Sequence, residues 1–595
     1  MLAITYNNSS VQAGLSELLR LWSDTRVVGL GCVLFLFVYI LILLPLYRLL
    51  AGPLRHVPGP LLCKVSSFYL AFFDLSCRRN DQILLWHQRY GPVVCIAPNE
   101  VSVASLDGTR EIYSARQGWA KSDYFDRFTG YNRRSIFATK SHEEHRAKRK
   151  LTSAFYQASN VFTLPEVEER VRERCRAVAA QIRHGEDVDV YSLTDRYALD
   201  VITHIVLGPN HCTQSVEQPS GPENDLLMEL KQLQFVGPFR IRFPRAFWCL
   251  SQLLGRLMSR RLGYLLANDK LAAWSLAPMS AAMNDPLLFS GSNSLLKRLL
   301  QLQHQQQKQH QQQRDSIRDF DIEYIAAEVL DNINAAEATV AVTATYLIWH
   351  LSRNPAWQQR VRDELMALQA RGEKEEGKEE GKEEGKEEGK EEGKEEEDSF
   401  TTPAFADVNN ISRAPVLEAC LREVYRLHPA SSGRAERVVP RGGRSVSGVP
   451  LPEGTVVAAS VMALHRDPVL FPDPDRFAPE RWLPPRDPPE AAATDGVKHK
   501  HERYYDNDDD DALLKARTAQ LIPFGYGGRI CLGQPLATME IKLLVAELYT
   551  RFETVITPSS SDAHDMKQSS THDAVPRALK CIVHFHKLGG MARNS

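Results

Sequence analysis

One stretch near the C-terminus constrains this chain more than any other: Leu521–Ala537, with the sequence LIPFGYGGRICLGQPLA. It places a cysteine, Cys531, among closely spaced glycines and just before a run with helical character. Glycines allow positive φ and let the backbone approach a flat object that side chains would keep away. Amide groups and the dipole of the following helix would favour the thiolate form of Cys531. The alternative is a glycine-rich turn in which the cysteine is incidental.

A thiolate held ahead of a helix can serve as an axial ligand of haem iron. The loop resembles the haem-binding loop of the cytochrome P450 family, and the matching positions are Phe524, Gly527, Arg529, Cys531 and Gly533. The resemblance implies that these residues hold one haem b, with Cys531 as the iron ligand. It also implies that Arg529 contacts a haem propionate, a role that suits a planar, bidentate guanidinium.

The composition is that of a globular protein, because 43% of the 595 residues are hydrophobic, 25% are charged, and the formal net charge is −2. This near-neutral balance argues against a nucleic-acid partner. The ten cysteines include no CxxC pair, so neither a zinc site nor a disulfide framework is indicated, and a reducing compartment suits them. Length alone would suggest about four domains.

An uncharged apolar run over residues 27–47 is long enough to cross a bilayer as a helix. A signal peptide would have a shorter apolar part and a small-residue cleavage site, and none is visible. The balance of basic residues predicts that the bulk of the chain is cytosolic and that residues 1–26 are lumenal, at the endoplasmic reticulum membrane. In that orientation Asn7 and Asn8, which each begin an N-x-S sequon, are candidate glycosylation sites.

The remaining chain, residues 55–595, is predicted to form one large domain. It opens with a proline-rich elbow, RHVPGP over residues 55–60, which breaks any helix. Tyr90–Val103 predicts two short strands and a turn. Both segments resemble the N-terminal part of membrane-bound fungal members of the family.

Three low-complexity inserts lengthen this domain without adding another. Residues 301–313 are glutamine-rich and are interpreted as a connector. Residues 372–398 repeat GKEE, and the glycine in every fourth position costs a helix about 1 kcal/mol each, so we expect a disordered surface loop. Residues 506–511, with the sequence DNDDDD, are expected to behave similarly.

Three further segments have helical or mixed character. Ser141–Tyr156 is basic, and in the family His145 and Arg149 fall where side chains contact a haem propionate, although a solvated basic face is the simpler interpretation. Leu164–Gly208 shows amphipathic helical patterns. Phe235–Leu257 mixes aromatics with arginines, which suits either a loop on the core or a surface that touches the membrane near the substrate entrance.

A long alanine-rich helix is predicted over Ile322–Pro355. In the family, the corresponding helix crosses the oxygen-binding side of the haem and carries small residues, an acid and a threonine. Thr339 falls at the threonine, but Ala338 stands at the position of the acid. Glu337 lies one residue earlier, about 100° around the helix, and cannot simply replace it. Thr339 and Glu337 are the candidate catalytic residues, and the proton relay stays unassigned.

A second family signature lies in Glu418–Pro429, EACLREVYRLHP. Glu423 and Arg426 stand at i,i+3 and can pair, which on a surface would contribute little. In the family this pair is buried with a downstream arginine, for which Arg481 in FAPERW is the candidate. Between these motifs the sequence alternates like short strands, and the resemblance assigns Arg437 to a haem propionate.

Together these motifs imply a mainly α fold with small β-sheets behind an N-terminal transmembrane helix. The implied reaction inserts one oxygen atom from O₂ into an apolar organic molecule, with electrons from NADPH through cytochrome P450 reductase and with cytochrome b5 as a further candidate donor. Ala338 keeps open a haem-thiolate isomerase, a dehydratase or a peroxide-dependent enzyme. A membrane-tethered haem protein without turnover is the third alternative. The sequence style resembles filamentous fungi, where secondary-metabolite tailoring and xenobiotic oxidation are both common roles of such enzymes.

Overall fold

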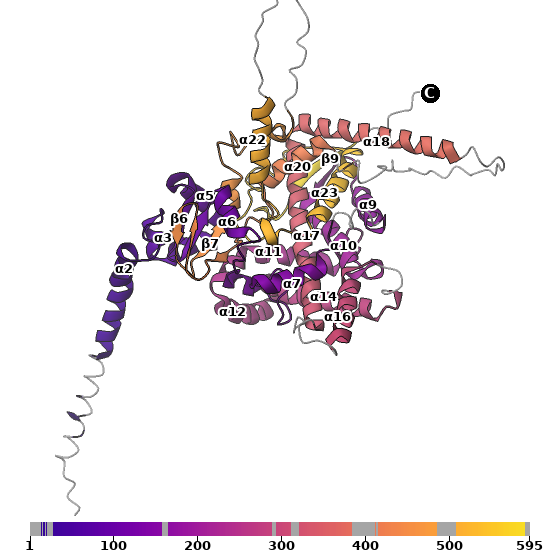
Figure 1. The fold of residues 1–595 in the computed structure, drawn as a ribbon. Coiled ribbons are helices and arrows are strands. Elements are labelled where there is room, and N and C mark those ends of the chain that lie inside the picture. Colours follow the sequence, from indigo (N-terminus) through magenta and orange to yellow (C-terminus); the bar gives the residue numbers. More distant parts are fainter. Residues whose placement is uncertain are drawn as a thin grey trace, which may run out of the picture.

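The computed structural model describes most of the chain outside its inserts and its ends. The described residues are 14, 16–17, 20, 28–157, 165–287, 293–310, 321–383, 411, 414–484 and 507–588. Within them, helices dominate and short strands gather mainly on one side, as Figure 1 shows. The predicted mainly α fold with small sheets is therefore confirmed.

The helices have the following bounds: η1 Tyr39–Leu43, α2 Leu44–Leu50, α3 Leu61–Val65, α4 Ser67–Leu75, α5 Arg79–Tyr90, α6 Leu106–Tyr113, η2 Asp123–Phe128, α7 His142–Thr152, α9 Pro165–Ala180, α10 Val190–Leu207, η3 Pro209–His211, α11 Pro222–Arg242, α12 Pro244–Leu257, α13 Ser259–Leu262, η4 Gly263–Leu266, α14 Ala267–Asn284, α16 Leu295–His310, α17 Ile322–Arg353, α18 Pro355–Glu383, α20 Pro415–Leu427, α21 Val461–Leu464, η6 Pro479–Trp482, α22 Asn507–Gln520, η7 Gly527–Arg529 and α23 Gln534–Tyr549.

The strands form three small sheets. Their bounds are β1 Val93–Ala97, β2 Glu100–Val103, β3 Glu186–Asp189, β4 Arg437–Val438, β5 Arg444–Val446, β6 Val449–Leu451, β7 Val456–Ala459, β8 Phe552–Val555 and β9 Ile582–Lys587. The sheets have the orders β1-β2-β7-β4, β3-β9-β8 and β5-β6. The strand pair predicted in Tyr90–Val103 is β1 and β2, which pair antiparallel. In the largest sheet β7 lies between β4, which carries Arg437, and the N-terminal strand β2.

The apolar run near the N-terminus is helical over Val28–Leu50, with a mean hydropathy of 2.7, and none of its most apolar window is buried. By length and composition this helix can cross a membrane. In Figure 1 its C-terminal part, α2, leads away from the helical body. The prolines of the predicted elbow separate α2 from α3, as expected from their fixed φ and missing donors.

The core is organised around α17, the predicted central helix. Every residue from Val340 to Ser352 is buried. The helix packs against α10, α14, α20 and α23. Asp321 caps its N-terminus by accepting a hydrogen bond from the amide of Tyr324. The alanines of this helix allow its neighbours to approach closely, so α17 holds a fixed position in the middle of the protein (Figure 1).

Helices extend into all three inserts, which corrects the disordered-loop expectation for the acidic run and for the described part of the GKEE repeat. Residues 384–398 of the repeat lie outside the described part. The glutamine-rich connector is helical up to His310, and the residues after it lie outside the described part. The GKEE repeat continues α18 as far as Glu383, where the Lys–Glu spacing and the well-packed preceding turns outweigh the glycines. The acidic run begins α22 at Asn507, and negative charge suits a helix N-terminus.

The loop interpretation of Phe235–Leu257 was wrong, because the segment forms the end of α11 and all of α12. Pro244 starts α12 at its first turn, a position that tolerates proline. Phe243, Trp248, Leu253 and Leu257 are exposed, with Trp248 at 63% and Leu257 at 74%. Exposed large apolar side chains on an amphipathic helix remain consistent with the predicted membrane contact.

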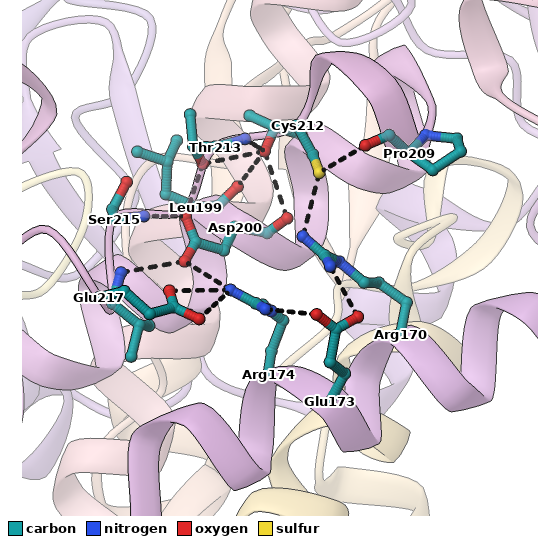
Figure 2. A network of polar contacts seen from close by, with 12 residues as sticks. Arg170, Glu173, Arg174, Leu199, Asp200, Pro209, Cys212, Thr213, Ser215 and Glu217 are labelled. Atoms are coloured by element: carbon teal, nitrogen blue, oxygen red, sulfur yellow. Dashed lines mark hydrogen bonds and ion pairs between the residues drawn. The ribbon is translucent and has the colours of Figure 1, made fainter. Parts of the chain in front are cut away.

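A buried polar network fixes the loop after α10 to the helices beneath it, as Figure 2 shows. The carboxylate of Asp200 accepts hydrogen bonds from the amides of Ser215 (2.7 Å) and Val216 (3.0 Å). Arg174 from α9 pairs with Glu217 at 2.8 Å. These contacts connect α9 and α10 to the loop that follows α10.

Candidate functional site

The cysteine loop folds as a tight turn that delivers Cys531 to the start of α23. The amide of Cys531 donates to the carbonyl of Phe524 (2.9 Å), which closes the loop on itself. Gly525 and Gly527 have φ of +81° and +72°, a region that favours glycine. Gly533 is the residue directly before α23. The five residues that carried the sequence resemblance are thus brought together in one turn.

Opposing effects act on the thiol of Cys531. Its side chain keeps accessible surface, yet the protein packed around it raises the pKa of the thiol. The amides of Gly533 and Gln534 and the charge of Arg149 act in the opposite direction. The amides thus act in the direction predicted from the sequence, and burial outweighs them. A metal cation at the sulfur would reverse this balance.

We expect Gly527→Ala to disable the loop far more than Gly525→Ala. A Cβ at Gly527 would collide with the backbone of Tyr113, whereas a Cβ at Gly525 meets nothing within 4 Å. Both substitutions carry the cost of placing alanine at positive φ, about 1–2 kcal/mol. The difference in stability between the two variants therefore measures the cost of the collision with Tyr113. Thermal unfolding and haem content of the two purified variants provide the measurement. Equal effects would contradict the predicted close approach.

Three arginines point toward the region around the cysteine loop without a carboxylate partner. Arg149 donates to the carbonyl of Ile530 (2.7 Å), and Arg529 donates to the carbonyl of Thr139 (2.7 Å). Arg437 is buried and donates to the carbonyl of Glu436 (3.0 Å). Within the described residues, none of the three arginines forms an ion pair. Uncompensated guanidinium groups in one place are suited to binding carboxylates.

The mutual repulsion of these cations shows how close together they are. Burial, followed by the charge of Arg437, lowers the pKa of Arg529 to about 9. Burial and the charges of Arg529, Lys121, Arg149 and Arg437 lower the pKa of His145 to about 2, so this imidazole is neutral at physiological pH. His145 can therefore donate or accept a hydrogen bond here, but it adds no charge.

Lys121 is a further member of this cluster that sequence reasoning missed. It is buried, and its Nζ lies over the rings of Phe125 (4.0 Å) and Phe137 (4.4 Å). Burial, Arg437 and Arg529 lower the pKa of Lys121 well below its usual value. Lys121 stands alone in the segment WAKSDYF, far in sequence from Arg437 and Arg529, and no motif connects it to them. Its proximity to these arginines is therefore evident only in the folded protein.

The central helix places its candidate residues on different faces. Thr339 donates its hydroxyl to the carbonyl of Ala335 (2.8 Å), one turn earlier, and Ala335 keeps accessible surface inside the protein. Glu337 is buried on the other side, where burial raises its pKa to about 8 against the attraction of Lys231. It lines a small cavity with Leu227 and Trp274. The carboxyl of Glu337 is therefore directed away from Thr339.

The pair Glu423–Arg426 is fully buried, with Nη2 of Arg426 and Oε1 of Glu423 2.7 Å apart. Arg426 also donates to the carbonyls of His465, Pro474 and Arg476, so all its N–H groups are used. Arg481 approaches Glu423 at 3.4 Å through Nε, which makes no hydrogen bond. Trp482 donates to Glu423 at 2.8 Å. This network joins α20 to the segment that precedes the cysteine loop.

Comparison with known proteins agrees with this geometry. The sequence model of the Cytochrome P450 family matches residues 67–576. The chain therefore belongs to the cytochrome P450 family, and it is a P450 monooxygenase. The family implies a haem-thiolate centre. The residues present fit that group, because a lone thiol faces a set of glycines and a group of cations that lack counter-ions.

Curated relatives cover nearly the whole chain. The cytochrome P450 monooxygenase FGM1 of Gibberella zeae is 35% identical over 556 residues, which are 92% of this chain and 95% of the relative. The cytochrome P450 monooxygenases orf2 of Aspergillus niger and hepC of Aspergillus oryzae are each 24% identical, over 93% and 92% of this chain and over 96% and 94% of their own lengths.

Proposed function

We propose that this protein inserts one oxygen atom from O₂ into an apolar organic molecule, with electrons that NADPH delivers through a membrane-bound reductase. One substrate molecule, O₂, NADPH and one proton give the hydroxylated product, water and NADP⁺. The observation that carries the proposal is the thiol of Cys531 at the start of α23, with Arg149 beside it and with Arg529, two residues earlier, close to Arg437. The fungal relatives favour a place in secondary metabolism.

The residues of this site have separate tasks in the proposal. Haem b, when bound, supplies oxygen activation. Cys531 would hold the iron through its sulfur, and the amides of Gly533 and Gln534 hydrogen-bond to that sulfur. Arg149, Arg437, Arg529 and Lys121 neutralise the propionates. Thr339 orders water beside the reacting oxygen, since its hydroxyl proton is directed to the carbonyl of Ala335 and its oxygen is left to accept.

We further propose that the protein is anchored in the endoplasmic reticulum membrane by residues 28–50, with the catalytic domain in the cytosol. The length and hydropathy of this helix support an anchor. The exposed apolar side chains of α12, among them Trp248 and Leu253, would provide a second lipid contact. An entrance close to lipid favours apolar substrates. The reductase, and cytochrome b5 as a further candidate, would reach the domain from the cytosolic side.

The proposed reaction predicts a strict requirement for reductant. Protein reconstituted with reductase in vesicles should consume NADPH and O₂ together, and ¹⁸O from ¹⁸O₂ should appear in the product of an accepted apolar compound. Extracts of the host organism provide the substrate pool, and mass spectrometry provides the measurement. Ala338 favours one alternative, a haem-thiolate enzyme that needs no NADPH. Product formation without NADPH and O₂ would replace the proposal by that alternative.

A further inference from the structure

Two acids lie on the same face of α17 as Thr339. At 100° per residue, Glu328, Asp331, Ala335, Ala338 and Thr339 fall within a stripe of roughly 100° along the helix. This stripe runs acid, acid, alanine, alanine and threonine. Between Asp331 and Thr339 the stripe carries only the small side chains of Ala335 and Ala338. The stripe excludes the carboxyl of Glu337.

Asp331 keeps accessible surface although protein surrounds it, as Cys531 does. Its carboxyl accepts a hydrogen bond from the buried hydroxyl of Ser135. The charged groups that act on it are Lys121, from the segment before α7, and Glu328, one turn earlier on α17. Within the described residues, Asp331 makes no ion pair. It is therefore an ionisable group directed inward, with a hydroxyl and not a cation as its partner.

Glu328 connects Asp331 to the protein surface. Its Oε1 accepts the amide of Ile136 at 2.7 Å, its carboxyl also hydrogen-bonds with Tyr324, and the charge of Lys148 from α7 acts on it. Lys148 is buried and pairs at 2.7 Å with Glu144, whose side chain is 43% exposed. The groups Glu144, Lys148, Glu328 and Asp331 thus lead in order from solvent to the inner stripe.

We propose that Asp331 is a proton-carrying residue that serves Thr339 in place of the acid missing at Ala338, and that Glu328 returns protons to it. Eight residues separate Asp331 from Thr339, a rise of about 12 Å. Water must bridge that distance, and the alanines of the stripe leave room for it. Asp331 does not touch the reacting atoms. It acts through this water and through the hydroxyl of Thr339, and in that sense it is a positioning residue rather than a catalytic one.

The acidities of the two carboxyls suit such a transfer. Burial raises the pKa of Asp331 to about 6, against the opposing effects of Ser135 and Lys121. Burial and the charge of Asp331 raise the pKa of Glu328 to about 8. Near neutral pH, Glu328 is therefore mostly protonated and Asp331 mostly ionised. A proton that Asp331 releases toward Thr339 can therefore be replaced from Glu328. Burial and the charges of Glu328 and Asp331 raise the pKa of Tyr156, so its phenol stays neutral and does not compete for this proton.

The proposal can be tested without knowing the substrate, by how O₂ is reduced in its absence. Reduction to water consumes four electrons and four protons per O₂, and therefore two NADPH. Reduction to hydrogen peroxide consumes two electrons and two protons, and one NADPH. A defect in proton delivery should shift electrons from water to peroxide. The ratio of NADPH to O₂ and to peroxide measures this shift in the reductase-reconstituted holoenzyme.

We expect Asp331→Asn to lower the rate of water formation by about 10- to 100-fold, at or below the 10²-fold effect typical of a directly positioned acid. Peroxide should rise in proportion. Adding Ala338→Asp to Asp331→Asn should restore water formation, which a merely structural defect would not allow. Glu323→Gln, which changes an exposed acid at the start of α17, is the matched control and should leave the partition unchanged.

A second readout does not depend on turnover. Infrared difference spectra of the oxidised holoenzyme should contain a protonated-carboxyl band that titrates near pH 6 and that disappears in Asp331→Asn. If this variant yields no haem-loaded protein, Asp331→Glu provides the test. It should retain a titrating carboxyl band and the wild-type division of electrons between water and hydrogen peroxide. An unchanged partition in Asp331→Asn, or no rescue by Ala338→Asp, would overturn the proposal.

The inference rests on the proposed function, and the two fail differently. If the wild-type protein with reductase consumes no NADPH, the proposed function fails. If the wild type reduces O₂ normally and Asp331→Asn behaves identically, only the role of Asp331 fails.

Discussion

Replacing Cys531 with alanine should abolish NADPH-dependent oxygenation completely. The sulfur is the single soft ligand that the loop presents at the start of α23, and the surrounding carbonyls and guanidinium groups cannot take its place at a haem iron. The variant should also lose the strongly red-shifted Soret band of its reduced carbon-monoxide complex. Absorbance spectra and product formation with reductase provide the two measurements.

Cys249→Ala is the matched control for this experiment. Cys249 is exposed on α12, far in sequence from the cysteine loop. Its replacement should change neither the spectrum nor the activity. If Cys531→Ala retains oxygenation and the red-shifted band, a different residue ligates the iron, and the proposed site is wrong.

Glu423→Gln should destabilise the protein by about 3–5 kcal/mol, the cost of leaving a buried charge without its partner. Both carboxylate oxygens of Glu423 bind Arg426, and neither side chain has any exposed surface. A neutral amide cannot compensate the guanidinium of Arg426, which has no route to solvent. Because the network holds the segment before the cysteine loop, the variant should also lose haem. Denaturant unfolding and haem content after purification are the measurements.

Arg422 provides a control on the same helix. Its Nε lies 2.7 Å from Glu418, but both side chains are about one third exposed, so this pair contributes only a few tenths of a kcal/mol. Arg422→Gln should therefore leave unfolding and haem content almost unchanged. Similar losses in Arg422→Gln and Glu423→Gln would show that α20 tolerates no polar change, and that the buried pair has no special role.

The parts of the site that the sequence predicts are those in which neighbouring residues fix the geometry. The cysteine loop is one turn, so the order of its glycines, Arg529 and Cys531 is also its arrangement in space. Glu423 and Arg426 are three residues apart on one helix, and that spacing makes them neighbours. The apolar run at the N-terminus and the central helix are similarly local patterns.

The parts that the sequence does not predict depend on contacts between distant segments or on competing local terms. Lys121 joins Arg437 and Arg529 only because β4, the cysteine loop and the segment before α7 meet. The helical extension of α18 into the GKEE repeat depends on nucleation by the packed turns before it. The pKa of Cys531 depends on burial as well as on amides, and sequence alone does not give burial.

The central claim is that Cys531 holds a haem through its thiolate, and the reduced carbon-monoxide spectrum of the purified wild-type protein tests it most directly. Full-length protein expressed with its N-terminal helix, solubilised and reduced under carbon monoxide, should show a strongly red-shifted Soret band. Protein that binds no haem, or that binds haem with the unshifted band of a neutral axial ligand, would contradict the account.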